Sequence, residues 1–373
     1  MQPLPIINQK PDHNPSVVDW FTPSLEGDGR IFTFAIEDEP KFHSEAAIFV
    51  ESLIEYLEKD DEICIVVCND FEELSDELKI IGKVYGNKLR FLFGHNWRNK
   101  TLDYPQKSSN PGMNKLEALK RVSYYCEEGD MIIHTDSDLF LYKEFNKRAI
   151  PNKDTLSWNW IIANDIDRDA PFFTYGDKKG KGIWTPELLE IMGCTTEYKG
   201  GGVSGFFTGK TLKNKKFIDD CFRFAHLLHS VASILDPKGR IVRHNASDMP
   251  CYALSLTYNN INYNVEDIEE FTVDNIGNEE IIEGSFYHYY SDLKNEGGAQ
   301  GAFYKSKWYK QMYHGRGSFH LSPDQNLLFD NDINKYLENA QSKHESYFFE
   351  LAIKARNKLF STNYIEELIR LEH

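Results

Sequence analysis

Two aspartates one residue apart, Asp136 and Asp138, follow the apolar run MIIHT at residues 131–135. If the strand continues through them, side chains alternate between faces, so both carboxylates point to one side and Ser137 is turned away. A divalent cation relieves the repulsion between two such charges, and oxygen ligands suit Mg²⁺ or Mn²⁺. The alternative is a polar turn with a helix cap. The pattern predicts a metal site that substrate phosphates complete.

The segments before the aspartates alternate between strand and helix patterns. Strands are predicted where β-branched and aromatic residues are dense, and helices where apolar residues recur every three or four positions, the first one capped by Ser44. This alternation predicts an α/β fold with a mostly parallel central sheet flanked by helices, and such sheets bind ligands beyond the carboxyl ends of their strands. The strands are expected at 31–36, 62–68, 89–93 and 130–135, and the helices at 44–59, 72–81 and 114–126.

The pattern is looser after residue 142. The segment GGGVSGFFTG introduces a further strand, and helices are expected at 212–235 and 248–258. From about residue 318 the chain is polar and then helical, and we expect this part to pack against the main domain rather than a membrane. The expected domains are an irregular lead-in at 1–28, a main domain at 29–310 and a C-terminal helical extension at 311–373.

The composition indicates a folded, acidic protein. The chain has 373 residues, 41% of them hydrophobic, and a net charge of -16, which argues against a general nucleic-acid binder because that needs a basic face. Its six cysteines show no paired CxxC spacing, so reduced, buried thiols are expected. We see no signal-peptide pattern and no apolar run long enough to span a membrane, and expect a soluble cytoplasmic protein. The oligomeric state stays open.

The strand order, the helix NKLEALKRVSYYC and the segment DMIIHTDSDLFL resemble GT-A glycosyltransferases over roughly residues 29–310. The resemblance implies a Rossmann-like, nucleotide-sugar-binding half at 29–142 and an acceptor half at 143–310. It also implies a Mn²⁺ or Mg²⁺ on the diphosphate of a UDP-sugar or GDP-sugar donor. Asp138 would ligate this metal directly, and Asp136 would contact the metal or the ribose.

Resemblance to the glycogenin-like, retaining branch rests on two later segments. FYHYYSD contains His288, which matches a third metal ligand of that branch. YKSKWYK places Lys305 and Trp308 at a Lys-x-Trp-like element, although the family form is tighter and has a proline between them. A neutral imidazole beside two carboxylates suits Mn²⁺ better than Mg²⁺. The alternative for His288 is an ordinary histidine in an aromatic cluster, so retaining and inverting chemistry both stay open.

The resemblance further implies donor contacts at the ends of the first two strands and at the helix before the aspartates. Lys115 would reach the diphosphate, where its charge offsets phosphate repulsion. The alternatives are a solvated helix end for Lys115 and a helix cap for Asn69 and Asp70. The expected contacts to the base and ribose are Thr33, Phe34, Ala35 and Asp70.

Three more residues belong to the expected site. Ser137, between the aspartates, is assigned to donor binding. Gly202 lies in a run of three glycines, where a backbone without side chains can approach a ligand, although a tight turn also explains the run. Asp248 is the catalytic candidate: it would stabilise positive charge at the anomeric carbon or, in an inverting enzyme, deprotonate the acceptor hydroxyl. Its alternative role is to start a helix with Pro250.

These features predict a metal-dependent glycosyltransferase that moves a sugar from a nucleotide sugar to an acceptor hydroxyl. A haloacid-dehalogenase-like phosphatase is disfavoured, because that family has its aspartates on the first strand. A nucleotidyltransferase that makes nucleotide sugars would show a glycine-rich basic loop after the first strand, and FAIEDEPKFH is not one. A non-catalytic carbohydrate-binding protein of the same fold stays open, and neither the donor sugar nor the acceptor is defined.

Overall fold

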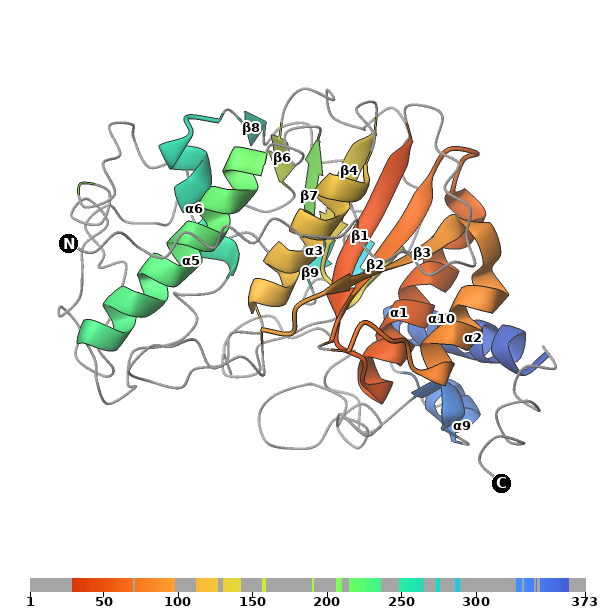
Figure 1. Ribbon diagram of the computed structural model, residues 1–373. Coiled ribbons are helices and arrows are strands. Elements are labelled where there is room, and N and C mark those ends of the chain that lie inside the picture. Colours follow the sequence, from red (N-terminus) through yellow and green to blue (C-terminus); the bar gives the residue numbers. More distant parts are fainter. Residues whose placement is uncertain are drawn as a thin grey trace.

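The computed structural model describes the chain in segments, drawn in colour in Figure 1. The lead-in predicted at 1–28 lies outside them. The described residues are 29–69, 71–97, 112–126, 130–141, 156–158, 190, 206–209, 215–235, 248–261, 263–264, 273–275, 286–288, 327–330, 332–338, 340 and 343–361.

A mostly parallel sheet forms the centre of the described structure. Its strands are β1 (Arg30–Ile36), β2 (Glu62–Cys68), β3 (Leu89–Gly94), β4 (Met131–Thr135), β6 (Leu156–Trp158), β7 (Phe206–Gly209) and β8 (Tyr263–Asn264). They lie in the order β3-β2-β1-β4-β7-β6-β8 (Figure 1), and β3, β2, β1 and β4 are parallel to one another. β7 is antiparallel to β4. The predicted α/β class is therefore confirmed, and the four strands expected before the aspartates are all present.

The parallel strands are buried because helices cover both faces of the sheet. Every residue of β2 and β3 is buried, which explains their nearly continuous apolar sequence. The charged residues near the start of these strands are paired. Arg90 is 1% exposed, and its Nη2 lies 2.8 Å from Oε1 of Glu62. Burial of these charges is tolerated because each has a partner.

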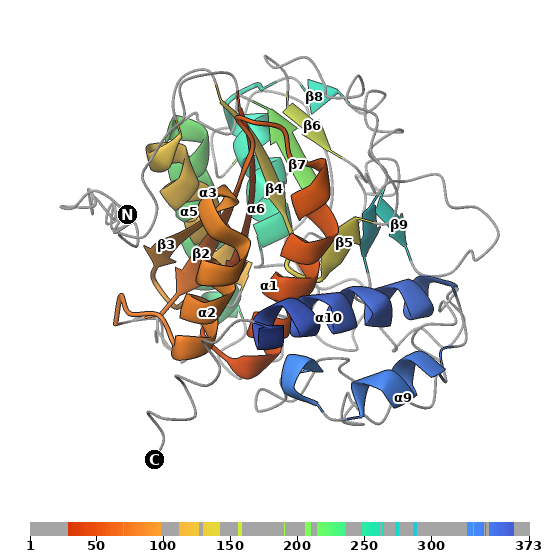
Figure 2. The same cartoon turned by 90° about the vertical axis from the view of Figure 1, so that its right-hand side faces the viewer.

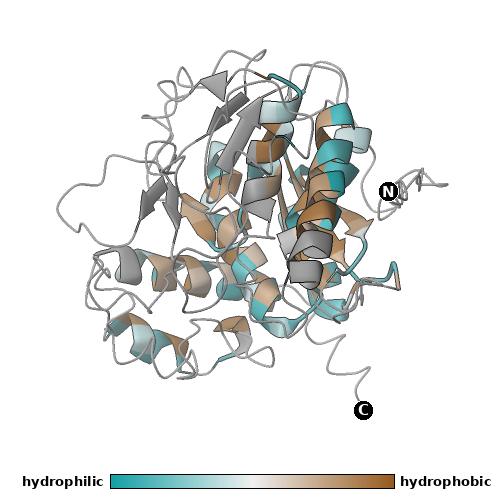
Figure 3. Cartoon of the chain, turned by 90° about the vertical axis from the view of Figure 1, so that its left-hand side faces the viewer, coloured by the Kyte–Doolittle hydropathy of each residue, from teal (hydrophilic) through white to brown (hydrophobic). Residues whose placement is uncertain are grey.

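The helices lie in two layers. They are α1 (Pro40–Leu53), α2 (Asp76–Tyr85), α3 (Gly112–Tyr125), α5 (Lys215–Leu235), α6 (Asp248–Tyr258), α9 (Ile333–Glu338) and α10 (Lys343–Ser361). Figure 2 shows α3 and α5 on one side of the sheet and α1, α2 and α10 on the other. The helices carry apolar (brown) and polar (teal) positions, whereas the described central strands are mainly apolar (Figure 3).

Two helices begin at other residues than the sequence predicts. α1 starts at Pro40 rather than after Ser44, because proline suits the first turn of a helix. α2 starts after Ser75, whose side chain accepts from the N–H of Leu78, so Asn69 does not cap it. Oδ1 of Asn69 instead accepts from the N–H groups of Phe71 and Glu72, at 3.3 and 3.0 Å, within a loop.

A second sheet was not expected from the sequence. It contains β5 (Leu139–Leu141), β9 (Val273–Asn275) and β10 (Phe286–His288), in the order β5-β10-β9. Its first strand directly follows the two aspartates. These aspartates therefore lie where the chain leaves the large sheet and enters the small one.

The C-terminal helix α10 packs against α1, as Figure 2 shows. Phe348 lies against Phe140 of β5, with ring centroids 6.0 Å apart. Glu51 of α1 is fully buried and binds Lys354 and Lys358 of α10, at 3.2 and 2.9 Å. This part of the predicted extension therefore packs against the main domain, as expected.

The described cysteines are free thiols: Cys64, Cys68, Cys221 and Cys251 are buried, and Cys126 is partly exposed. Burial raises the pKa of Cys64, Cys68 and Cys221 well above the ordinary value. No helix in the described ranges is long and apolar enough to cross a membrane.

Gly94, at the end of β3, allows α3 to pack closely on the sheet. A Cβ at this position would lie 2.7 Å from Cγ of Glu117 and 3.0 Å from Cγ1 of Val66. We expect Gly94→Ala to lower the free energy of unfolding by about 1–3 kcal/mol through overpacking, as measured by urea denaturation. Gly86→Ala is the contrasting variant, because a Cβ there meets nothing within 4 Å and only the positive φ of 69° opposes it. A wild-type free energy of unfolding for Gly94→Ala would contradict the tight packing.

Candidate active site at the carboxyl edge of the sheet

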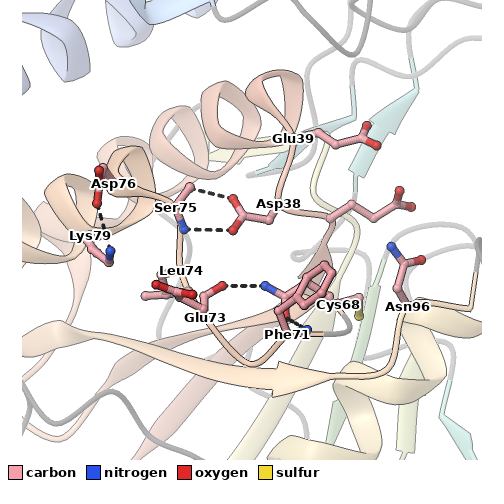
Figure 4. A pocket seen from close by; sticks show the side chains of 12 residues that line it. Asp38, Glu39, Cys68, Phe71, Glu73, Leu74, Ser75, Asp76, Lys79 and Asn96 are labelled. Atoms are coloured by element: carbon pink, nitrogen blue, oxygen red, sulfur yellow. Dashed lines mark hydrogen bonds and ion pairs between the residues drawn. The ribbon is translucent and has the colours of Figure 1, made fainter. Parts of the chain in front are cut away.

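A cavity of about 550 Å³ lies at the carboxyl ends of β1, β2 and β3 (Figure 4). Acidic and amide side chains dominate its lining, so it offers many hydrogen-bond acceptors to a ligand. It is the edge of the sheet at which ligand binding was predicted. The lining residues are Glu37, Asp38, Glu39, Cys68, Asn69, Phe71, Glu73, Leu74, Ser75, Asp76, Lys79 and Asn96.

Hydrogen bonds hold the wall formed by α1 and α2. Oδ1 of Asp38 accepts from Oγ of Ser75 at 2.6 Å, and Oδ2 accepts from the backbone N–H of Ser75 at 2.9 Å (Figure 4). Nε2 of His43 lies 2.7 Å from Oδ1 of Asp38. Burial alone would raise the pKa of Asp38, but the hydrogen bonds from His43 and Ser75 lower it overall. Asp38 is therefore held as a carboxylate that ties the two helices together.

The aromatic ring of Phe71 stands at the rim of this cavity and is 87% exposed. The ring is accessible from the cavity that it lines. A flat ring in this place can stack on an aromatic ligand such as a nucleobase.

The first turns of α3 connect the cavity to the aspartates. Nδ2 of Asn114 donates to Oε1 of Glu37 at 3.2 Å, and its Oδ1 accepts from the N–H of Trp97 at 2.8 Å. The next residue, Lys115, forms an ion pair with Oδ1 of Asp136. Two consecutive residues of one helix therefore contact the cavity lining and the predicted metal site.

The segment between β4 and β5 does not continue as an extended strand. β4 ends at Thr135, and Ser137 and Asp138 lie in a bend. Residues 136–138 were expected to continue the strand, and this expectation is wrong, because the chain turns here from one sheet into the other. Strand alternation therefore does not determine where the two carboxylates point. Asp136 faces Lys115 of α3, whereas Asp138 lies close enough to Glu45 of α1 for its charge to act on that residue.

Glu45 and Lys41 support this bend from α1. Oγ of Ser137 donates to Oε2 of Glu45 at 2.7 Å, and Nζ of Lys41 lies 3.7 Å from Oε1 of Glu45. Glu45 and Lys41 are only 5% and 6% exposed. Burial raises the pKa of Glu45, with a further upward contribution from Asp138 that Lys41 opposes.

A neutral histidine lies beneath the bend. His134 of β4 is buried, and its Nε2 is 3.1 Å from the hydroxyl of Tyr252 on α6. Burial lowers the pKa of His134 to about 4, against a smaller upward contribution from Asp136. His134 is therefore uncharged at neutral pH and links β4 to the helix that Asp248 begins.

The predicted residues of β1 lie beside this site. Thr33 and Phe34 are buried, and the ring of Phe34 packs edge-on against Phe49, with centroids 4.8 Å apart. Ala35 is partly exposed and lies two residues after Thr33, whose Cα partner on β4 is His134. Ala35 is thus close to the strand end that carries Asp136. Their contacts with a donor stay predictions.

The remaining predicted residues are placed by their backbones or not described. In the small sheet, His288 of β10 is the Cα partner of Leu139, the residue after Asp138. This pairing brings the backbone of His288 beside the aspartates, and its role as a ligand stays a prediction. Asp248 is the first residue of α6. Asp70, Gly202 and Lys305 lie outside the described residues.

The donor set of the bend fits a hard divalent cation. Carboxylate oxygens from Asp136 and Asp138 are ligands that Mg²⁺ and Mn²⁺ accept, and such ions are often held by one or two carboxylates plus substrate phosphates. Within the described segments, no group of three or more His, Cys, Asp or Glu side chains is arranged to hold a metal.

Several residues of this site were not predicted from the sequence. Glu37, Asp38 and Asn96 lie within two residues of the carboxyl ends of β1 and β3, so the rule that ligands bind at these ends could have selected them. Asn114 begins the helix predicted at 114–126, but no role was predicted for it. Glu45 gave no signal, because a charged residue within a helix is normally exposed.

No protein-family model and no curated protein matches this chain. Among solved structures, the apo bifunctional glycosyltransferase WbbM is 9% identical with a TM-score of 0.43, over 88% of this chain and 52% of that chain. The chain thus spans about half the length of that protein. The galactosyltransferase LgtC, in complex with donor and acceptor sugar analogues, is 10% identical with a TM-score of 0.44, over 88% and 99% of the two chains. Likenesses this weak carry no information about activity.

Proposed function

We propose that this protein is a metal-dependent glycosyltransferase that moves a sugar from a nucleotide sugar to an acceptor hydroxyl. The observation that carries the proposal is the bend that contains Asp136 and Asp138. Asp136 forms an ion pair with Lys115, and the bend lies at the same edge of the sheet as the polar cavity. A nucleotide sugar has two parts that need such an arrangement: a nucleoside that hydrogen-bonds and stacks, and a diphosphate that needs positive charge.

The nucleoside would occupy the cavity. Ribose hydroxyls and base N–H groups are donors, and the lining supplies carboxylate and amide acceptors. The exposed ring of Phe71 offers a stacking surface for the base. The link from Asn114 to Glu37 fixes the cavity relative to α3, so the nucleoside and the diphosphate would be held in a defined relation.

The diphosphate would lie between Lys115 and the two aspartates. A bound Mg²⁺ or Mn²⁺ held by Asp136 and Asp138 would act as a Lewis acid for the charge that develops on the leaving group. Lys115 adds a positive charge at the same place, and its pairing with Asp136 orients it before the donor binds. His134 stays neutral below them and adds no competing charge.

The finer assignments follow the same resemblance. Asp248 would act near the anomeric carbon, His288 would complete the metal shell, and Thr33, Phe34, Ala35, Asp70, Ser137, Gly202 and Lys305 would contact the donor. UDP-sugars and GDP-sugars are both candidate donors, and a glycan, a protein or a small molecule is a candidate acceptor.

A thermal-shift panel tests the proposal. UDP, GDP, ADP and CDP are each added to the wild-type protein with Mn²⁺, with Mg²⁺ and with EDTA. We expect one nucleoside diphosphate to raise the melting temperature only with the metal, because binding to the folded state alone stabilises it by about 2.7 kcal/mol at 100 times Kd. Metal-dependent hydrolysis of the matching nucleotide sugar would separate an enzyme from a carbohydrate-binding protein. Stabilisation by none of the nucleotides would overturn the proposal.

A further inference from the structure

One face of α1 follows the metal-binding bend and the strand after it. The residues on this face recur at helical spacing: Lys41, Glu45, Ile48 and Ser52. Oε2 of Glu45 accepts from Ser137, and Oγ of Ser52 accepts from the N–H of Leu141 at 2.9 Å. Ile48 lies in the same apolar cluster as Phe140. α1 therefore holds the segment from Ser137 to Leu141 by hydrogen bonds at both ends and apolar contact between them.

The two charged residues on this face, Lys41 and Glu45, are costly for stability because both are buried. Glu45 is buried beside Asp138, where a third carboxylate adds repulsion, and its burial requires the buried ammonium of Lys41. A well-packed apolar pair in the same place would often be neutral or more stable. The geometry that this arrangement provides is the bond to the hydroxyl of Ser137, the residue between the two aspartates.

We propose that Glu45, held by Lys41, is a positioning residue that fixes the bend between Asp136 and Asp138 through the hydroxyl of Ser137. This inference rests on the proposed function, since it assigns the bend to metal binding. Ser137 has one hydroxyl hydrogen and donates it to Glu45. The peptide units on either side of Ser137 are thereby oriented, and they determine where the two carboxylates stand.

The effect should appear in metal affinity. Loss of a hydrogen bond that orients a ligand typically weakens metal binding by about 10- to 100-fold. We expect Ser137→Ala and Glu45→Ala each to raise the Mn²⁺ concentration at half-saturation by about 10-fold or more. The double variant Glu45→Ala/Ser137→Ala should bind Mn²⁺ no worse than the more affected single variant, because both changes remove the same bond.

A charge-neutral variant separates the hydrogen bond from the ion pair. Lys41→Met together with Glu45→Gln removes both charges and keeps an amide oxygen that can accept from Ser137. This variant should bind Mn²⁺ within about three-fold of wild type, since only the orienting bond matters for the metal. Glu51→Gln is the matched control. Glu51 is a buried carboxylate on the same helix, but it binds Tyr85 and α10 instead of the bend.

The experiment titrates Mn²⁺ into each variant, alone and with UDP or GDP, and follows free Mn²⁺ by electron paramagnetic resonance and protein stability by thermal shift. Glu51→Gln should lower the melting temperature and leave the Mn²⁺ half-saturation at its wild-type value. Wild-type Mn²⁺ affinity in both Ser137→Ala and Glu45→Ala, or an equal loss in Glu51→Gln, would refute the positioning role alone. Absence of Mn²⁺ binding in the wild type would refute the metal site and the positioning role together.

Discussion

Asp138→Ala is expected to abolish the stabilisation by Mn²⁺ and nucleoside diphosphate, and to lower the rate of sugar transfer by about 1,000-fold. The second effect corresponds to the loss of about 4 kcal/mol of charge stabilisation that a bound metal supplies to the leaving group. The melting temperature of the ligand-free protein should stay the same or rise. Asp138 adds to the charge repulsion on the buried Glu45, and its removal relieves that repulsion.

The matched control for this variant is Asp332→Ala. Asp332 is a half-exposed aspartate before α9 that pairs with Lys335, so its removal changes the net charge equally without touching the bend. We expect its metal-dependent thermal shift and its transfer rate to equal those of the wild type. A normal metal-dependent shift in Asp138→Ala would exclude Asp138 as a ligand.

Arg90→Met should destabilise the fold strongly, because it breaks a buried ion pair. The guanidinium of Arg90 is buried, binds Oε1 of Glu62 at 2.8 Å and donates to the carbonyl of Asn87 at 2.8 Å. Its loss leaves a buried carboxylate without its counter-charge, which typically costs about 3–5 kcal/mol. Urea denaturation of Arg90→Met would measure the cost. The control Arg90→Met/Glu62→Gln should regain most of it, because the hydroxyl of Tyr125 still binds residue 62.

The pH dependence of this variant provides a second check. Burial raises the pKa of Glu62 above 4.5, and Arg90 opposes that rise. Without Arg90 the pKa in the folded state rises further, so the folded protein binds a proton more tightly than the unfolded chain. Its free energy of unfolding then falls as the pH increases above 4.5, and falls more than in the wild type. The deficit should be larger at about pH 7.5 than at about pH 5, and a deficit independent of pH would contradict this account.

The parallel strands of the large sheet were predictable because each can be recognised from its own sequence. EICIVVC is short, almost entirely apolar and bounded by the polar residues Asp61 and Asn69, which is typical of a strand covered on both faces. The small sheet was not predictable, because β10 has three residues and pairs with a strand that lies far earlier in the chain, as the partners His288 and Leu139 show. No local sequence pattern predicts a pairing between strands so far apart.

Part of the site was predictable for the same reason. Asp136 was selected from a local pattern and Lys115 from the family resemblance, and the structure brings them into an ion pair. The support from Glu45 was not predictable, since its burial depends on the bend that follows β4. The contact between Glu51 and α10 was not predictable either, since Glu51 and Lys358 are 307 positions apart in the sequence.

The packing of α10 on α1 has a consequence for folding during synthesis. The ribosome releases β1 to β5 long before residues 343–361 exist. Until then Glu51 lacks Lys354 and Lys358, and Phe140 lacks Phe348, so the side of α1 and β5 that α10 will cover remains open to solvent and chaperones. Translation must therefore proceed about 200 residues beyond β5 before α10 can pack on α1. This sequence separation is long compared with that of the local contacts that speed folding.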